Sequence, residues 1–391
     1  MSNAIITHSL RIPVLMELEA GMPVIQNGTV QFNKEFVGGA GTSIEILLPS
    51  FGNTIGIGSD VTSDISDIKN GSVPVTLVQY HKAVLMDQID RALKLSSERD
   101  QVTKPNAMKM ASDLQTIAID ELRKSAATCT VTTTQKYTDI GEGVAAVEAS
   151  RLNGDVFGVM SPKIAKGVTD SGLTLFQSDL KGNFTNGRIG SYLGCEFNKT
   201  QDMGSTFVIG AQTLTTPTVT GTYAEGATTL NFSATSLVGT FKKYQVLNVV
   251  GINSVDIYGN DTGIPYAFIL QADITAGSNT MAATIQGVYA TGPLKNVTAL
   301  PVATNVWSTA HAAGTYQTVI VWDKQAFVTA TAKMKPFAIS KSQGTEGKIM
   351  NLMCQEVSDG VKGIDLMRWD FLAGFKVLYR SGVSRVDIKV A

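Results

Sequence analysis

Cysteine, histidine and charge are all scarce in this chain of 391 residues. The three cysteines are odd in number and far apart, which excludes a disulfide framework and a paired zinc spacing and favours a reducing cytoplasm. Only 17% of residues are charged, against a typical value of about 25%. The formal net charge is −1. A dedicated nucleic-acid binder would be basic, so this balance argues against one.

Targeting and membrane segments are also missing from the sequence. The first apolar stretch has no cationic start and is interrupted by His8, Arg11 and Pro13, so we expect no signal peptide. The long uncharged stretches are rich in Thr, Ser, Gly and Asn, and none is an apolar run of about 20 residues that would span a bilayer. With 43% apolar residues, the chain is expected to fold into two or three domains.

Patterns of catalytic residues are almost absent. For nucleophilic catalysis, one of the histidines (His8, His81 or His311) would have to meet a cysteine or an activated serine. No G-x-S-x-G elbow, P-loop or H-E-x-x-H motif occurs. We therefore predict that the chain is not an enzyme and binds neither a cofactor nor a metal.

Two weaker patterns allow both a functional and a structural interpretation. Residues 141–146 match the dinucleotide fingerprint G-x-G-x-x-A, but Glu142 would place a carboxylate among the phosphates. Lys163 stands about 20 residues further on, where a ribose-binding acid is expected. The oxygen-rich stretch 256–261 suggests a calcium loop but lacks the EF-hand register. We favour the structural interpretations, a flexible helix N-terminus and an Asx-rich hairpin turn.

Apolar spacing and turn residues predict the main elements. The clearest helix is expected over 104–127, where apolar residues recur every three or four positions after Thr103 and Pro105. Further helices are expected over 140–151 and 162–168. Strands are expected over 43–48, 54–57, 73–78, 156–160, 228–232, 245–250, 266–272, 279–285, 319–322, 363–369, 375–378 and 384–390.

Charge is unevenly distributed along the chain. It is dense over 82–127 and sparse over 213–301, a stretch that we predict to be an independent β module, either a small barrel or a sandwich. Residues 1–35 show no apolar period, and 36–80 alternate short β runs with glycine turns. An isolated two-stranded ribbon is marginal in water, so we expect neighbouring subunits to cover these flanks.

Short segments follow one another in an order that is more informative than any single motif. They are 73–77, 81–84, 98–108, 119–120, 187–197, 241–274, 363–366 and 380–390. In this order they resemble the major capsid proteins of tailed bacteriophages, which share the Hong Kong 97-type fold. The resemblance is greatest to the short-tailed phage coat proteins that carry an insertion domain.

This resemblance implies an α+β fold of the Hong Kong 97 type with an inserted small β-barrel domain. The implied parts are an N-terminal arm (1–35), an E-loop (36–80), a P-domain with a long spine helix (81–137), an A-domain in two parts (138–212 and 302–358), an inserted β domain (213–301) and closing strands of the P- and A-domains (359–391). In such shells the arm and loop lie across adjacent subunits. Phe32, Phe36, Phe51, Ile55 and Ile57 are therefore expected to be buried against neighbours.

The resemblance also implies a function and a set of partners. The chain would assemble as hexamers and pentamers into an icosahedral shell that encloses double-stranded DNA without specific binding. It would be assembled in the host bacterial cytoplasm and would reside in the virion. Its expected partners are a separate scaffolding protein, a portal protein and, in some shells, a decoration protein, with no membrane. The alternatives are an encapsulin-like nanocompartment shell and a multidomain β-rich ligand- or carbohydrate-binding protein.

Overall fold

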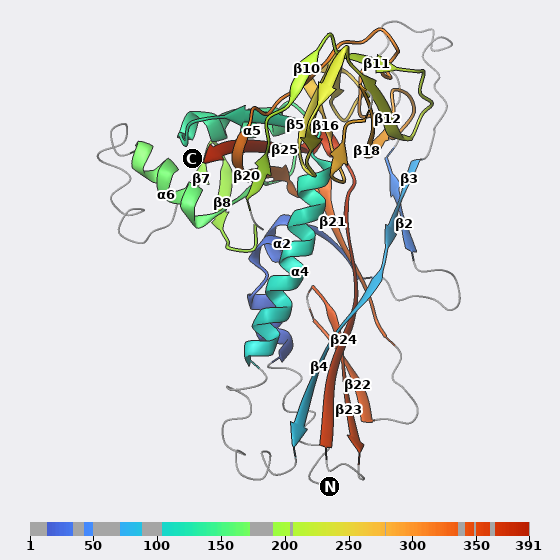
Figure 1. Cartoon of the computed structure of the whole chain (residues 1–391). Helices are drawn as coiled ribbons and strands as arrows, with labels where there is room; N and C mark the ends of the chain where they lie inside the picture. Colours follow the sequence, from blue (N-terminus) through green and yellow to red (C-terminus); the bar gives the residue numbers. More distant parts are fainter. Residues whose placement is uncertain are drawn as a thin grey trace, which may run out of the picture. The chain divides into compact units, whose positions relative to one another are not determined.

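A computed structural model describes most of the chain as a strand-rich α+β protein (Figure 1), in agreement with the predicted class. The described residues are 14–33, 43–49, 71–87, 104–172, 191–203, 206–277, 279–334, 341–347, 349–359 and 364–390. The chain divides into two units, one formed by 1–44, 74–119 and 327–376 and the other by 45–73, 120–326 and 377–391. None of the helices in the described ranges combines the length and apolar character needed to cross a membrane.

The first unit is built on a six-stranded sheet. Its strands follow the order β1 (Val30–Asn33), β21 (Phe327–Ala332), β24 (Ile364–Val377), β23 (Asn351–Asp359) and β22 (Lys341–Glu346), with β4 (Val78–Asp87) also paired to β24. The sequence predicts two strands where β24 runs without a break. A Cβ atom on Gly374 would lie 2.5 Å from the carbonyl oxygen of Thr76, so glycine allows a close backbone approach inside β24 instead of ending it.

Residues 14–33 are folded and buried within the first unit. Residues 14–20 are helical, α2 spans Pro23–Gly28, and β1 then runs parallel to β21. Fully buried side chains recur at helical spacing: Val14, Leu18, Met22 and Ile25. The expectation of an arm without an apolar period is wrong for this part, because Gly21 and Pro23 interrupt a period that continues across them.

The second unit contains a seven-stranded sheet with helices on one face. Its strands follow the order β5 (Thr128–Thr132), β25 (Val383–Val390), β20 (Gly314–Asp323), β6 (Val156–Met160), β8 (Cys195–Lys199) and β7 (Ser191–Tyr192), with β9 (Phe207–Ile209) also paired to β20. Helices α5 (Tyr137–Glu148) and α6 (Pro162–Gly172) pack their apolar sides on this sheet. Strand β25 is parallel to β5, antiparallel to β20, and buried along almost its whole length.

Helix α4 spans Lys104–Ser125, close to the predicted range 104–127. Its buried positions, which include Ala107, Leu114 and Leu122, follow the predicted stripe. Residues 104–119 belong to the first unit and the remainder of the helix to the second.

Residues 213–301, called the insert below, form short strands between β9 and β20. The strands are β10 (Thr213–Thr215), β11 (Thr218–Thr220), β12 (Ala227–Ser233), β13 (Ser236–Val238), β14 (Thr240–Phe241), β15 (Val246–Val255), β16 (Asp261–Ile269), β17 (Ile274–Thr275) and β18 (Thr280–Val288), followed by β19 (Trp307–Thr309). Their core includes Phe232 and Phe241 of the insert, together with Ala127 and Trp307 from outside it. Apart from Ala127 and Trp307, the buried residues of this core lie within 213–301, and the insert falls in the second unit. That the insert is an independent module stays a prediction.

Strands β2 (Ser43–Leu48) and β3 (Gly71–Thr76) form a two-stranded ribbon. Ile46, Leu48 and Val75 are buried within the chain itself, at 7%, 4% and 0% exposure. This face of the ribbon is therefore covered within the chain, and the cover of the rest of 36–80 by neighbouring subunits remains a prediction. The opposite face carries Glu45 and Leu47, both exposed. The strand predicted over 54–57 lies outside the described residues.

Candidate functional site

Strand β25 carries two charged residues on one face of the second unit's sheet. Arg385 and Asp387 are two positions apart and both fully buried. Because side chains alternate along a strand, Val386 and Ile388 point to the opposite face, where they join the apolar core with α5. The charged pair is therefore the centre of a polar cluster inside the protein.

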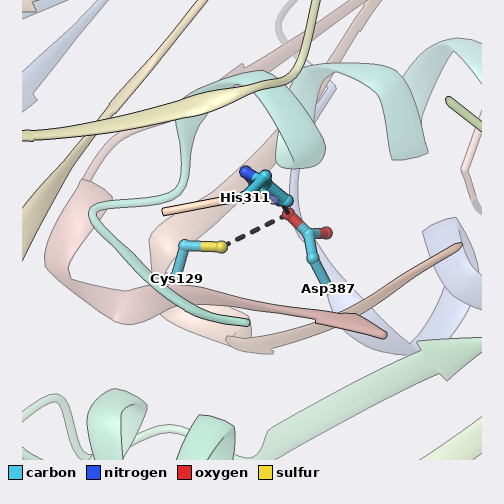
Figure 2. Close-up of side chains that lie close together, drawn as sticks. All are labelled: Cys129, His311 and Asp387. Carbon is cyan, nitrogen blue, oxygen red and sulfur yellow. Dashed lines mark hydrogen bonds and ion pairs between the residues drawn. The ribbon is translucent and has the colours of Figure 1, made fainter. Parts of the chain in front are cut away.

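Asp387 accepts hydrogen bonds at both carboxylate oxygens. Its Oδ2 accepts from the guanidinium of Arg385. The same oxygen faces the Nε2 of His311 at 2.9 Å and the thiol of Cys129 at 3.3 Å (Figure 2). Its Oδ1 accepts from the hydroxyl of Thr318 at 2.7 Å. Burial alone would raise the pKa of Asp387, but Arg385 and His311 outweigh burial and hold that pKa well below its usual range. The carboxylate is therefore ionised inside the protein.

A second arginine lies against this pair. Arg385 donates to the carbonyl oxygens of Arg123 at 3.2 Å and of Tyr244 at 3.1 Å. The guanidinium carbon of Arg123 lies 4.0 Å from the ring centroid of Tyr244 and 5.0 Å from that of Phe207. Burial, together with the neighbouring Arg385, lowers the pKa of Arg123 to about 10. We call Arg123, Cys129, His311, Thr318, Arg385 and Asp387 the polar cluster.

The cluster contains the types of residue that a cysteine nucleophile needs, but in the wrong arrangement. An active thiol donates its proton to a histidine that a carboxylate orients. Here the carboxylate of Asp387 stands between Cys129 and His311 and accepts from both. Burial and the neighbouring Asp387 raise the pKa of the Cys129 thiol well above its usual value. The thiol therefore stays protonated, and the arrangement supplies no nucleophile.

The same three residues form a possible metal-ligand set, with their ligand atoms within 4.8 Å of one another. The backbone N–H of Val246 points at Nδ1 of His311 at 3.4 Å, so Nδ1 accepts and Nε2 carries the proton. A metal on Nε2 would require the proton on Nδ1, where it would face another N–H. Arg385 also provides the carboxylate with a cation already. The residues therefore fit a hydrogen-bonded ion cluster and do not fit a metal centre.

The fingerprint over 141–146 has a packing role. Gly141 and Gly143 lie inside α5, whereas a phosphate-binding loop would precede the helix. A Cβ atom on Gly143 would lie 2.8 Å from Cγ2 of Val386, so glycine allows α5 to approach β25 closely. The interpretation as a flexible helix N-terminus is therefore wrong too, because both glycines are buried in the helix.

The oxygen-rich stretch 256–261 forms the predicted hairpin turn, between β15 and β16. Oδ1 of Asp256 accepts from the backbone N–H groups of Tyr258 at 2.9 Å and Asn260 at 2.8 Å. Its Oδ2 accepts from the side-chain amide of Asn260 at 3.1 Å. This is an Asx turn, in which the carboxylate caps backbone donors.

Of the predicted inter-subunit contact residues, the structure describes only one. Phe32 lies in β1, opposite Ala330 of β21. Phe36, Phe51, Ile55 and Ile57 lie outside the described residues. Their role in contacts remains a prediction.

Sequence reasoning missed the polar cluster. Cys129, His311 and Asp387 come from three distant parts of the chain, and the pairing of β25 with β5 and β20 brings them together. The one local signal was a charged pair, Arg385 and Asp387, at same-face positions of a strand that is otherwise mostly apolar.

Comparison with known proteins finds similarity only among solved structures, because no protein-family model and no curated protein matches the chain. The capsid of Ralstonia phage GP4 is 10% identical with a TM-score of 0.49, and the match covers 93% of this chain and 87% of that one. The capsid of the cyanophage P-SCSP1u is 11% identical with a TM-score of 0.46, covering 94% and 88%. A structure of Mycobacterium phage Che8 is 12% identical with a TM-score of 0.45, covering 89% and 85%. The chain is thus similar, at low identity, to phage structures over most of its length.

Proposed function

We propose that the chain is the major capsid protein of a tailed bacteriophage and that it self-assembles into the icosahedral shell around a double-stranded DNA genome. The observation that carries this proposal is the order of its elements. A β ribbon precedes a long helix, an α/β sheet follows, an insert of short strands interrupts that sheet, and long strands close the chain. This is the order of parts that the resemblance of the sequence implies.

Under this proposal, individual elements are assigned to the implied parts. Helix α4, over Lys104–Ser125, takes the place of the spine helix, and the β2–β3 ribbon takes the place of the base of the E-loop. The sheet with α5 and α6 takes the place of the A-domain. Two of the solved structures to which the chain is similar are described as phage capsids, and a shell subunit is the role proposed here.

The proposed role is structural and not catalytic. The Cys129, His311 and Asp387 cluster favours this role because its thiol is a hydrogen-bond donor to a buried carboxylate. As a shell subunit the chain would reside in the virion, form hexamers and pentamers, and enclose DNA without specific binding. A separate scaffolding protein and a portal protein are the further partners we propose, joined in some shells by a decoration protein.

Exposed apolar side chains mark surfaces for contact between subunits. Leu47 on the outer face of β2 is 70% exposed, and Leu85 on β4 is 64% exposed. Burial of a leucine on association stabilises a contact, whereas a buried carboxylate without a partner destabilises it. We therefore propose Leu47 as a contact residue of the ribbon, in addition to the residues predicted from the sequence.

The test is particle formation by the full chain, expressed alone and together with its scaffolding protein, and examined by electron microscopy and sedimentation. Large closed shells are the expected result in at least one of the two conditions. Leu47→Glu should raise the concentration needed for assembly at least tenfold, whereas Glu45→Lys, two residues away on the same exposed face, should have a much smaller effect. A stable monomer in both conditions would contradict the proposal.

A further inference from the structure

Tyr244 has an unusual backbone conformation for an aromatic residue. Its φ angle is +72°, in the left-handed region that side chains other than glycine and asparagine rarely adopt. A residue in this region is strained, and it stays there only where surrounding contacts hold it. Tyr244 lies in the insert, between β14 and β15, so those contacts identify what holds the insert in place.

Within the insert, the backbone N–H of Tyr244 donates to the carbonyl oxygen of Leu270 at 2.9 Å, and Lys243 Nζ lies 4.6 Å from its ring centroid. The other contacts of Tyr244 come from outside the insert. Its carbonyl oxygen accepts from Arg385 of β25 at 3.1 Å. Its ring lies under the guanidinium of Arg123, and its hydroxyl donates to Asp120, both in the last turns of α4. Burial, together with the hydrogen bond to Asp120, raises the pKa of Tyr244 to about 12, so the hydroxyl remains a donor. Backbone, ring and hydroxyl are thus each bound by a different residue.

We propose that Tyr244 is an anchor with two states, which couples the insert to the end of α4 and to β25. In the closed state, which the structure shows, contacts with Asp120, Arg123 and Arg385 maintain the strained backbone. In the open state Tyr244 relaxes to negative φ, and its ring and carbonyl oxygen leave Arg123 and Arg385. Opening then removes contacts from two buried cations, which keeps the closed state dominant.

Other contacts at the same place would loosen together with the anchor. The backbone N–H of Ala267 donates to the carbonyl oxygen of Ala127 at 2.8 Å, and the side chain of Gln271 donates to that of Lys124 at 3.3 Å. A separate attachment holds the insert at the turn between β15 and β16, where the backbone N–H of Ile257 donates to the carbonyl oxygen of Ser150 at 3.1 Å and Arg151 pairs with Asp256 at 3.4 Å. Opening of the anchor therefore frees one side of the insert and leaves it attached at the other.

Hydrogen exchange of the unassembled full chain, followed by mass spectrometry, tests the coupling. Tyr244→Ala should speed exchange at least tenfold both in the peptide 240–250 and in the last turn of α4, 119–128. Tyr223→Ala is the matched control, because the Tyr223 hydroxyl bonds Thr220 and Asn231 within the insert and touches neither α4 nor β25 by hydrogen bonds. It should speed exchange near 218–233 only. Unchanged exchange over 119–128 in Tyr244→Ala would overturn the proposal.

Two further variants distinguish the effect of backbone strain at Tyr244 from the effect of its side-chain contacts. Tyr244→Gly lacks the ring but adopts positive φ without strain, so its exchange should be slower than that of Tyr244→Ala. Equal exchange in both would show that the backbone strain plays no part. Tyr244→Phe keeps the ring over Arg123 and loses only the hydroxyl, so about twofold to fivefold faster exchange is expected. This variant also provides the readout over 119–128 if Tyr244→Ala does not fold. The result is independent of shell formation, because assembly is not required for the measurement.

Discussion

On one face of the second unit's sheet, β25 presents Val386 and Ile388 to α5; on the other, it presents Arg385 and Asp387 to the end of α4 and to Tyr244. Both faces are buried to a similar degree. The apolar face stabilises the fold through the area it removes from water. The polar face contributes less to the stability of the fold. The free-energy cost of removing two arginines and a carboxylate from water offsets much of the attraction between their charges.

The polar face contributes specificity instead. A strand that is buried on both sides receives little register information from burial alone, since apolar residues suit either face. A shift of β25 by one residue would turn Arg385 and Asp387 toward α5, where the core is apolar. Their partners, His311, Thr318 and Cys129, exist on one face only. We infer that the polar cluster fixes the register of β25 between β5 and β20.

Asp387→Ala should produce the largest loss, because it leaves Arg385 and Arg123 buried without their carboxylate. Breaking a buried pair in this way costs about 3–5 kcal/mol. The measurement is the free energy of unfolding in urea. Asp113→Ala is the control, since Asp113 pairs with Lys109 on the surface of α4 and is 55% exposed, and exposed pairs contribute about 0.2–1 kcal/mol. Equal losses in the two variants would show that the polar face contributes no more than the surface does.

The pH dependence of the unfolding free energy tests whether the charge of Asp387 is responsible for this loss of stability. The folded-state pKa of Asp387 lies below its unfolded value, which is about 3.9. The stability it contributes is therefore complete above that pH and is lost as the pH falls further toward the folded-state pKa. The gap in unfolding free energy between the natural chain and Asp387→Asn should be constant between about pH 7 and 5 and narrow below about pH 4. A gap that stays constant to pH 3 would assign the loss to packing alone.

Gly143→Ala tests the apolar face and should have the next largest effect. The new methyl group would lie 2.8 Å from Val386, so α5 must move away from the sheet. Overpacking of this kind costs about 1–3 kcal/mol. Gly141→Ala, in the same helix, would place its Cβ 3.4 Å from Cδ1 of Leu193 and 3.5 Å from the hydroxyl of Tyr192, which are ordinary contacts. It should stabilise the chain by up to about 1 kcal/mol, from helix propensity. Thermal unfolding of both variants gives the comparison, and a similar loss in both would contradict close packing at Gly143.

Local patterns predicted the helices α4, α5 and α6 and several of the strands, but not others such as β21 and β23. The strands at 43–48 and 156–160 agree with the structure residue for residue, and α4 differs only at its end. The helical turns before β1 were missed because Gly21 and Pro23 are breakers in isolation, although burial continues the period across them. Tertiary contacts with the rest of the first unit stabilise these helical turns, and a prediction from a short stretch of sequence does not include such contacts.

Local sequence patterns could not predict the polar cluster, for a related reason. Its members are joined by the parallel pairing of β5 with β25 and by the antiparallel pairing of β25 with β20. Strand order in a sheet depends on which apolar faces pack together. The positions of residues 129, 311 and 387 along the sequence do not indicate that their strands are neighbours in one sheet. The same holds for Tyr244, whose positive φ is maintained by residues of α4 and β25.

Substitution of Cys129 should have the smallest effect on stability. The reactivity of its thiol also shows whether the polar cluster is structural or reactive. Cys129→Val keeps the approximate volume and removes one of the donors to Asp387, whose remaining partners are Arg385, His311 and Thr318. The expected loss is about 0.5–1.5 kcal/mol in unfolding free energy. Because its pKa is raised, the Cys129 thiol should react with iodoacetamide at pH 7 more slowly than a free cysteine, as followed by peptide mass spectrometry. Faster alkylation at Cys129 would contradict the raised pKa of its thiol and would mean that the polar face of the sheet holds a reactive group.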